Sequence, residues 1–223
     1  FADFLKYTRA QGLEPVRPQP DETYLLGDAV VTVLGPRLDY DETNDTSLVL
    51  RVDFGETSFL FTGDMERTAE ADLLEAGCDL SATVLKVGHH GSETSTSYPF
   101  LREVLPEYAV ISVGTGNSYG HPSEEVLSRL SDAGAAVYRT DQLGHIVAVS
   151  DGQTVSFTFE KSEPEESVQG PQGQDTSGAV RYIGNVKSQV FHLETCANLP
   201  AERNQVEFSS REEAVAQGYR PCG

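Results

Sequence analysis

The sequence has few cysteines, few basic residues and no long apolar run. Three cysteines among 223 residues are too few for a disulfide framework. No stretch approaches the roughly 20 consecutive apolar residues that a membrane-spanning helix needs. Only 16 lysines and arginines oppose 35 aspartates and glutamates, and the net charge of -19 argues against nonspecific binding to a polyanion. A local basic site or a phosphate-neutralising metal ion remains compatible with this charge, whose simplest interpretation is solubility.

The length and the remaining composition are those of a globular protein. With 38% hydrophobic and 23% charged residues, 223 residues suffice for one full domain and a small additional unit. Residues 1–10 place Phe1, Phe4 and Leu5 on one helical face, and neither an initiator methionine nor a capping signal precedes them. We therefore expect this chain to be a fragment, or one half of a longer polypeptide.

The apolar pattern predicts strands joined by short turns first, and alternating strands and helices after residue 60. Hairpins are expected over 24–34 and 47–61. Helices are predicted over 66–76, 99–105 and 123–133. Further strands are predicted over 82–87, 108–113, 136–138, 146–149 and 154–159, the last of which closes the sheet. The pattern alone indicates an α/β or α+β fold.

Three of the predicted buried strands lead to an aspartate or a histidine. Asp64 follows the strand over 57–61, His89 and His90 follow the strand over 82–87, and His121 follows the strand over 108–113. Layered α/β proteins place their chemistry at the ends of central strands. Because carboxylates and imidazoles bind metals and act as acids and bases, the sequence predicts a functional site there.

These motifs resemble those of the metallo-β-lactamase superfamily, and within it the ComEC-like group associated with DNA uptake. In the family's order they are Asn44-Asp-Thr-Ser-Leu-Val-Leu50, Phe61-Thr-Gly-Asp64, Leu85-Lys-Val-Gly-His-His-Gly-Ser92, Ile111-Ser-Val-Gly114, Asn117-Ser-Tyr-Gly-His-Pro122 and Arg139-Thr-Asp141. They are specific as a set, although the family's first signature, His-x-His-x-Asp-His, does not occur in the sequence. The resemblance implies that residues 1–160 form the C-terminal part of a four-layer αββα sandwich.

By this resemblance, Asp64 bridges two divalent metal ions, zinc or manganese; the alternative is that it caps the helix beginning near residue 66. On an extended backbone the adjacent His89 and His90 would point in opposite directions, so only one would face the metals. We assign His89 as a metal ligand and His90 as a supporting catalytic residue, with local hydrogen bonding of both as the alternative. His121 is expected to be a further ligand, with substrate contact or proton donation as its alternative.

Polar residues around these ligands are candidates for contact with substrate. Asn44 stands where many relatives have a histidine, and an amide there favours hard ions such as manganese. Ser92 and Asn117 are expected to be catalytic and, with Asn44, to bind substrate; Ser92 alternatively caps its turn. His145 is interpreted as a surface residue and Cys78 as an ordinary buried thiol.

The C-terminal part has a different character. Residues 161–179 contain no aromatic and almost no aliphatic side chain, so we expect a flexible linker there. Residues 180–223 resemble the small zinc module of the Ada DNA-repair protein, which implies one structural zinc ion bound by His192, Cys196 and Cys222. So small a unit needs a metal to stabilise it. The alternative is a buried or disulfide-bonded cysteine pair beside an unrelated histidine.

The resemblance implies a metal-dependent hydrolase, a nuclease or other phosphodiesterase that acts on DNA or a similar substrate. This requires that the full protein contain the missing motif, because Asp64 and His121 cannot hold two metals alone. One alternative is a catalytically incomplete scaffold or DNA-binding protein that carries the zinc module. Another is a hydrolase of a carboxylic ester, a lactone or a surface-polymer phosphoester. ComEC-like domains act outside the cytoplasm, which favours an extracytoplasmic location, whereas thiolate zinc ligands also fit a cytoplasmic one.

Overall fold

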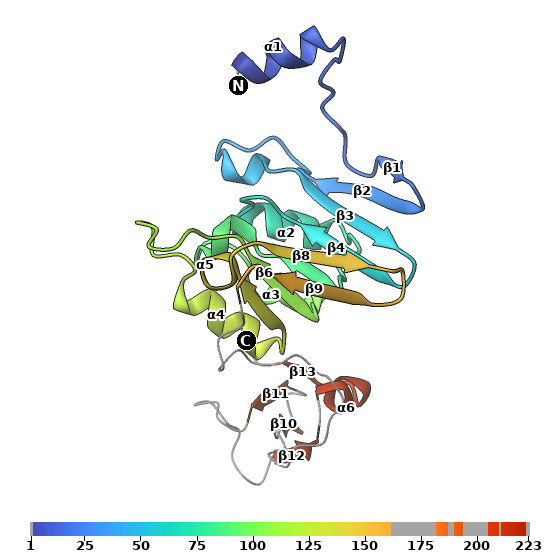
Figure 1. The fold of residues 1–223 in the computed structure, drawn as a ribbon. Coiled ribbons are helices and arrows are strands. Elements are labelled where there is room, and N and C mark those ends of the chain that lie inside the picture. Colours follow the sequence, from blue (N-terminus) through green and yellow to red (C-terminus); the bar gives the residue numbers. More distant parts are fainter. Residues whose placement is uncertain (1, 162–181, 187–189, 194–204, 210, 222–223) are drawn as a thin grey trace.

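A seven-stranded sheet is the centre of the fold (Figure 1). The computed structural model describes residues 2–161, 182–186, 190–193, 205–209 and 211–221. The strands lie in the order β1-β2-β3-β4-β5-β6-β7. Their bounds are Thr23–Leu26, Ala29–Gly35, Val49–Phe54, Thr57–Phe61, Val84–Lys86, Tyr108–Ile111 and Ala136–Arg139. The prediction of a mixed α/β fold is confirmed.

The sheet changes from antiparallel to parallel at β4. Strands β1 to β4 pair antiparallel, and β4 to β7 pair parallel. Antiparallel neighbours need only short turns, whereas parallel neighbours need a crossover. The crossovers contain the helices α2 (Arg67–Glu75), α3 (Tyr98–Val104) and α4 (Glu124–Asp132). The predicted N-cap of α4 is confirmed, because the Ser123 hydroxyl accepts from the Val126 amide at 3.3 Å.

The three crossover helices cover one face of the sheet. Leu60, Leu85 and Ile111 from the strands are fully buried in one cluster with apolar residues of the helices. The helical members of this cluster are Ala69, Leu73, Phe100, Leu101, Val104, Val126 and Leu130. Burial of this apolar surface is the main stabilising term of the fold.

The hairpin of β8 (Ile146–Ser150) and β9 (Val155–Phe159) lies on the opposite face of the sheet (Figure 1). The ring of Phe157 packs at a tilt against Tyr108 and Tyr138, with centroids 4.8 Å apart in each pair. The prediction that residues 154–159 close the main sheet is therefore wrong, since β9 pairs with β8 in a separate two-stranded sheet. The aromatic side chains of β9 pack at a tilt against the tyrosines on the face of the sheet, and these contacts favour the position of the hairpin there.

The N-terminal helix and several short helices complete this part of the fold. The predicted opening helix is confirmed as α1 (Ala2–Ala10), none of whose described residues is buried. Single turns η1 (Asn44–Thr46) and η2 (Gly88–Gly91) and the helix α5 (Thr140–Leu143) lie between strands. No helix among the described residues has both the length and the apolar character needed to cross a bilayer.

The C-terminal residues form a second, four-stranded sheet. Its order is β12-β10-β11-β13, with bounds Gln205–Phe208, Tyr182–Asn185, Val190–Leu193 and Arg220–Pro221, and it is accompanied by α6 (Arg211–Ala216). Phe191, Phe208 and Ala214 form its small core.

The predicted linker and zinc ligands cannot be placed on this second sheet. The linker lies outside the described residues except for Lys161, as do Cys196 and Cys222. Only the backbone of His192, in β11, is described. The zinc module therefore stays a prediction.

Candidate functional site

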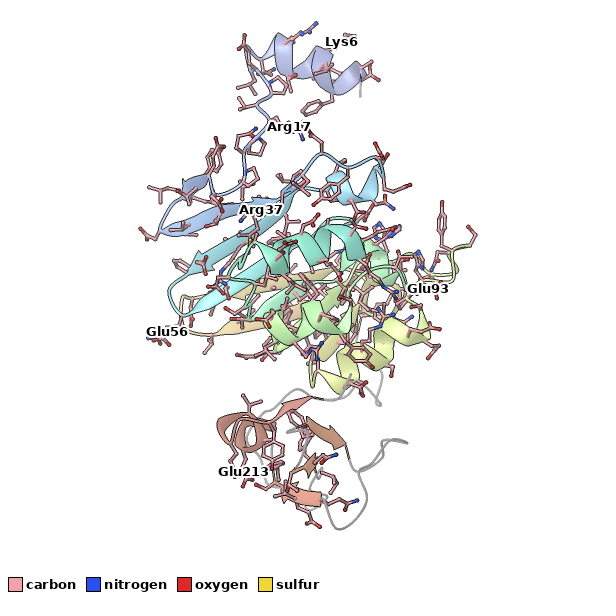
Figure 2. All side chains as sticks on the ribbon, turned by 180° about the vertical axis from the view of Figure 1, so that it is seen from behind. Lys6, Arg17, Arg37, Glu56, Glu93 and Glu213 are labelled. Atoms are coloured by element: carbon pink, nitrogen blue, oxygen red, sulfur yellow. The ribbon has the colours of Figure 1, made fainter. Side chains whose placement is uncertain are left out.

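Loops from three parallel strands meet at one edge of the sheet. Asp64 follows β4, His89 and His90 follow β5 in η2, and His121 follows β6. The carboxyl ends of parallel strands share an edge, so these loops become neighbours although they are far apart in sequence. The turn between β3 and β4, with Glu56, and the loop that follows η2, with Glu93, lie at opposite ends of the sheet (Figure 2).

A tight turn places Asp64. Gly63 has a φ of 56°, and a side chain there would come within 2.9 Å of the Ser47 side chain. The Ser47 hydroxyl accepts a hydrogen bond from the Asp64 amide at 3.0 Å, which fixes the turn to the neighbouring segment. The alternative role of helix cap falls to Asp45, whose buried carboxylate accepts from the Glu66 amide at 2.9 Å. The Asp64 side chain is left 45% exposed at the edge of the sheet.

The two adjacent histidines do not have the extended backbone that we assumed. His89 and His90 have φ angles of 47° and 54°, in the left-handed region. The premise that one of them must point away from the site is therefore wrong. Both rings face the cluster: His90 lies beside Asp64, and His89 lies beside Glu66 and His121.

The hydrogen bond between His90 and Ser112 determines which ring nitrogen of His90 faces Asp64. Its Nδ1 lies 2.7 Å from the Ser112 carbonyl oxygen, so Nδ1 carries a proton and donates it there. In the neutral ring Nε2 then carries a lone pair, and Nε2 lies 3.6 Å from Oδ1 of Asp64. Two acceptors facing each other at this separation favour a cation between them. A carbonyl that orients a histidine in this way is typical of metal ligands.

Glu66 is a second carboxylate at the site, which the sequence analysis did not anticipate. Its Oε1 lies 3.2 Å from Nδ1 of His89 and accepts from Nδ2 of Asn44 at 2.9 Å. The available signal was its position two residues after Asp64, next to the helix start. Asn44, which we expected to contact substrate, orients Glu66 in this structure.

The loop that carries His121 is organised by Asn117. Nδ2 of Asn117 donates to the carbonyls of Gly114 and His121 at 3.1 and 2.6 Å. Its Oδ1 accepts from the amides of Tyr119 and His121 at 3.2 and 3.1 Å. The side chain of Asn117 therefore shapes the loop, and its expected catalytic and substrate-binding roles stay predictions.

The surroundings of His121 favour the neutral form of its imidazole. Its ring lies edge-on to His89, with the centroids 5.7 Å apart. Burial lowers the pKa of His121, and the neighbouring rings of His89 and His90 lower it further. A neutral imidazole is the form that binds a metal ion.

Ser92 is buried in the turn that follows the histidines. Its hydroxyl lies 3.0 Å from the Thr94 hydroxyl and accepts from the Thr94 amide at 3.4 Å. Only 5% of the residue is exposed, and its catalytic and substrate-binding roles stay predictions. His145 lies on the surface as expected, with a 90% exposed side chain.

A buried polar pair braces the loop behind the histidines. Glu70 of α2 accepts from the amides of Thr96 and Ser97. Arg129 of α4 donates to the carbonyls of Ser95 and Thr96 at 2.9 and 3.2 Å. Both side chains lie almost entirely out of solvent. The helical layer thus holds the loop that positions the site.

Half-buried Lys86, at the end of β5, adds a positive charge near the site. Its ammonium donates to the Val87 carbonyl at 2.9 Å. Burial lowers the pKa of Lys86, and the negative charge of Asp64 opposes this shift. No prediction from the sequence placed Lys86 in the site.

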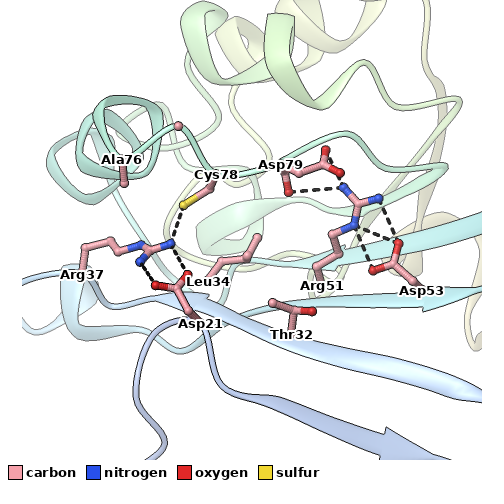
Figure 3. A pocket seen from close by; sticks show the side chains of 10 residues that line it. Asp21, Thr32, Leu34, Arg37, Arg51, Asp53, Ala76, Cys78 and Asp79 are labelled. Atoms are coloured by element: carbon pink, nitrogen blue, oxygen red, sulfur yellow. Dashed lines mark hydrogen bonds and ion pairs between the residues drawn. The ribbon is translucent and has the colours of Figure 1, made fainter.

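A separate polar cavity lies between β2, β3 and the loop after α2 (Figure 3). Its two arginines are already paired: Arg37 with Asp21 at 2.8 Å, and Arg51 with Asp53 and Asp79 at 2.9 and 2.7 Å. These ion pairs connect the sheet to the loop after α2. Because both guanidinium groups are neutralised by aspartates, the cavity offers little unpaired charge to a ligand.

Cys78 lines the same cavity. Its Sγ lies 2.7 Å from Nη2 of Arg37 (Figure 3). Cys78 is partly exposed, so our expectation of an ordinary buried thiol is wrong.

The donors at the sheet edge fit part of a metal site. Asp64, His90 and His121 supply a carboxylate and two imidazoles, which are ligands for zinc and manganese. Within the described part of the chain, however, no three His, Cys, Asp or Glu side chains are grouped closely enough to hold an ion. These residues can contribute ligands but do not complete a site.

Several proteins of known name are similar to this chain in sequence. ComE operon protein 3 of Bacillus subtilis (strain 168) is 36% identical over 143 residues, which are 64% of this chain and 18% of that protein. Competence protein ComA of Neisseria gonorrhoeae is 45% identical over 104 residues, 46% of this chain and 15% of that protein. Recombination protein 2 of Haemophilus influenzae is 41% identical over 103 residues, 46% of this chain and 13% of that protein.

The chain spans less than a fifth of the length of these relatives. Residues 1–115, slightly more than half of the chain, match the metallo-beta-lactamase superfamily. The large mixed sheet, with helices on one face and a second sheet on the other, is consistent with that superfamily's sandwich. The chain therefore belongs to the metallo-beta-lactamase superfamily.

Proposed function

We propose that this chain supplies part of the active site of a metal-dependent phosphodiesterase, a nuclease related to DNA uptake or processing. Members of the superfamily are generally hydrolases that use divalent metals. Two of the relatives are named for the ComE operon and for competence, and one is named for recombination. The observation that carries the proposal is the position of His90, whose Nδ1 is held by the Ser112 carbonyl and whose Nε2 lies 3.6 Å from Oδ1 of Asp64.

We propose that Asp64, His90 and His121 contribute metal ligands from this chain, and that His89 joins them or orients Glu66. The remaining ligands would come from protein residues outside these 223. Bound divalent ions would lower the pKa of a water molecule and neutralise charge on the leaving oxygen of the ester.

The other residues of the site prepare it for an anionic substrate. The Ser112 carbonyl holds the His90 ring in one tautomer. The ammonium of Lys86 places a positive charge at the end of β5, where it favours a phosphodiester anion. Asn44 and Glu66 fix the ring of His89 from the other side. This local positive charge matters because the protein as a whole carries a net charge of -19.

Metal binding and hydrolysis together test the proposal. Manganese affinity is measured by calorimetry, and activity is measured with bis(4-nitrophenyl) phosphate. We expect Asp64→Asn and His90→Gln to weaken manganese binding at least about tenfold and to abolish hydrolysis, because each removes a ligand. His145→Gln, on the exposed surface, is the matched control and leaves both properties unchanged. Wild-type affinity in both site variants would overturn the proposal.

A second candidate function is a DNA-binding scaffold without catalysis. The missing His-x-His-x-Asp-His signature and the incomplete group of ligands in the described part of the chain favour it. A protein that binds DNA without binding any divalent metal at this edge of the sheet would support the scaffold.

Three further parts of the proposal concern the remainder of the chain and its surroundings. One structural zinc ion bound by His192, Cys196 and Cys222 is tested by zinc analysis of the purified protein. DNA is the proposed partner. An extracytoplasmic location is the third, and fractionation of cells that produce the protein tests it.

A further inference from the structure

A cavity of about 410 Å³ adjoins the proposed metal site. Its walls come from the ends of β6 and β7 and from the loop that carries His121. They are formed by His90, Ser112, Val113, Gly114, Asn117, Tyr119, His121 and Thr140. His90 belongs both to this cavity and to the contact with Asp64, so a ligand in the cavity lies next to the proposed reacting centre.

Two polar side chains of the cavity walls, Thr140 and Asn117, form hydrogen bonds with the protein itself. The Thr140 hydroxyl accepts from the Val113 amide at 2.7 Å and donates to the Val113 carbonyl at 2.8 Å. Asn117 uses both side-chain atoms in its own loop, and Nδ1 of His90 binds the Ser112 carbonyl. The walls therefore present mainly apolar and aromatic surface, which recognises a ring by contact with its faces.

Tyr119 is an aromatic residue of this cavity whose ring is not needed to build the core. It is 81% exposed, so its ring contributes little to the core. One part of the ring stacks on His121, with centroids 5.8 Å apart and an angle of 19° between the planes. Asn117 accepts from the Tyr119 amide, which anchors the backbone that carries the ring. An exposed aromatic ring on an anchored loop is a platform on which a base can stack.

We propose that this cavity binds a nucleobase of the substrate, stacked on Tyr119, next to the phosphodiester at His90. The inference rests on the proposed function and names the substrate class more closely: single-stranded nucleic acid, whose bases are free to leave the stack. Stacking accepts every base, and walls that are mainly apolar do not select one. On a protein of net charge -19, contacts to the bases supply affinity that contacts to the backbone cannot.

The test compares oligonucleotides with and without bases. A fluorescein-labelled phosphorothioate decathymidylate and an abasic decamer of equal charge are titrated with the purified protein in manganese at constant salt. We expect wild type to bind the base-bearing strand about tenfold more tightly than the abasic strand. Tyr119→Ala should lose about tenfold for the base-bearing strand and nothing for the abasic strand, whereas Tyr119→Phe keeps wild-type affinity for both.

Tyr24→Ala removes an exposed tyrosine from the outer strand β1 and serves as the control. Its affinity for both strands should equal that of wild type. Unchanged manganese affinity in Tyr119→Ala shows that the neighbouring metal site is intact. Equal binding of both strands by wild type, or an equal effect of Tyr119→Ala on both strands, overturns the stacking inference alone. Failure of wild type to bind either strand overturns the proposed action on nucleic acid and the inference with it.

Discussion

Replacement of Glu70 should destabilise the fold and the site together. Glu70 is 1% exposed, and its two carboxylate oxygens accept the backbone amides of Thr96 and Ser97. Arg129 holds the carbonyls of the same loop from α4 and supplies the compensating positive charge. The helices therefore hold the loop after the histidines through one buried polar network.

The magnitude follows from the groups that each replacement leaves without a partner. Glu70→Gln keeps the shape of the side chain, but its NH2 group then faces a backbone N–H of the loop, so two donors meet. We expect this to cost about 1–3 kcal/mol of unfolding free energy. Glu70→Ala leaves both backbone amides unpaired and removes the negative charge next to Arg129, so we expect about 3–5 kcal/mol. Because the same loop follows His89 and His90, manganese affinity should also fall about tenfold.

Urea unfolding followed by circular dichroism measures these changes, and the absence of tryptophan makes this signal preferable to fluorescence. Glu75→Gln, on the exposed face of the same helix, is the matched control and should stay within about 0.5 kcal/mol of wild type. Losses below about 0.5 kcal/mol for both Glu70 variants would refute the reasoning.

The same carboxylate predicts the direction of a pH dependence. Burial raises the pKa of Glu70 above its ordinary value of 4.5, although its hydrogen bonds and Arg129 oppose the shift. The folded state then binds this proton more tightly than the unfolded state, so the contribution to stability is complete below pH 4.5 and is lost as the pH rises through the folded pKa. The unfolding free energy of wild type relative to Glu70→Gln should decrease over that window, and an increase would contradict this assignment.

Three further predictions concern other parts of the fold. Gly91→Ala should lower the unfolding free energy by about 2 kcal/mol or more, as urea titration would show, because φ is 84° and the new side chain would lie 2.6 Å from Pro122. Arg51→Met should cost about 1 kcal/mol of unfolding free energy or less, because Asp53 and Asp79 are 38% and 71% exposed and solvent screens the ion pairs, and manganese affinity should not change, since this cavity is separate from the site. Chelation of bound manganese should lower the unfolding free energy by about 2.7 kcal/mol relative to metal at 100 times its Kd, and an equal response in Asp64→Asn would refute this site as the source.

The strands and crossover helices were predictable because the spacing of their apolar residues indicates which face of each element is buried. The cap at Ser123 and the arrival of Asp64, His89 and His121 at one edge follow from strand ends alone. The conformation of His89 and His90 was not predictable, because left-handed histidines depend on contacts made after folding. The amide of His89 donates to the Gly63 carbonyl at 3.0 Å, and the ring of His90 donates to the Ser112 carbonyl.

Two other features also depend on tertiary structure. The residues of β9 alternate as a strand should, but alternation does not reveal which strand is the partner. Glu70 and Arg129 carry charges that usually remain in solvent, so their burial could be known only from the loop that they share.

The outer strand β1 has a consequence for handling the protein. It pairs only with β2 in the described sheet, all four of its residues are exposed, and Leu25 and Leu26 are 81% and 70% exposed. Its free backbone groups can form hydrogen bonds with the same strand of another molecule and so extend one sheet into the next. Concentrated samples should therefore self-associate, and a lysine in place of Leu25 should keep the molecules apart.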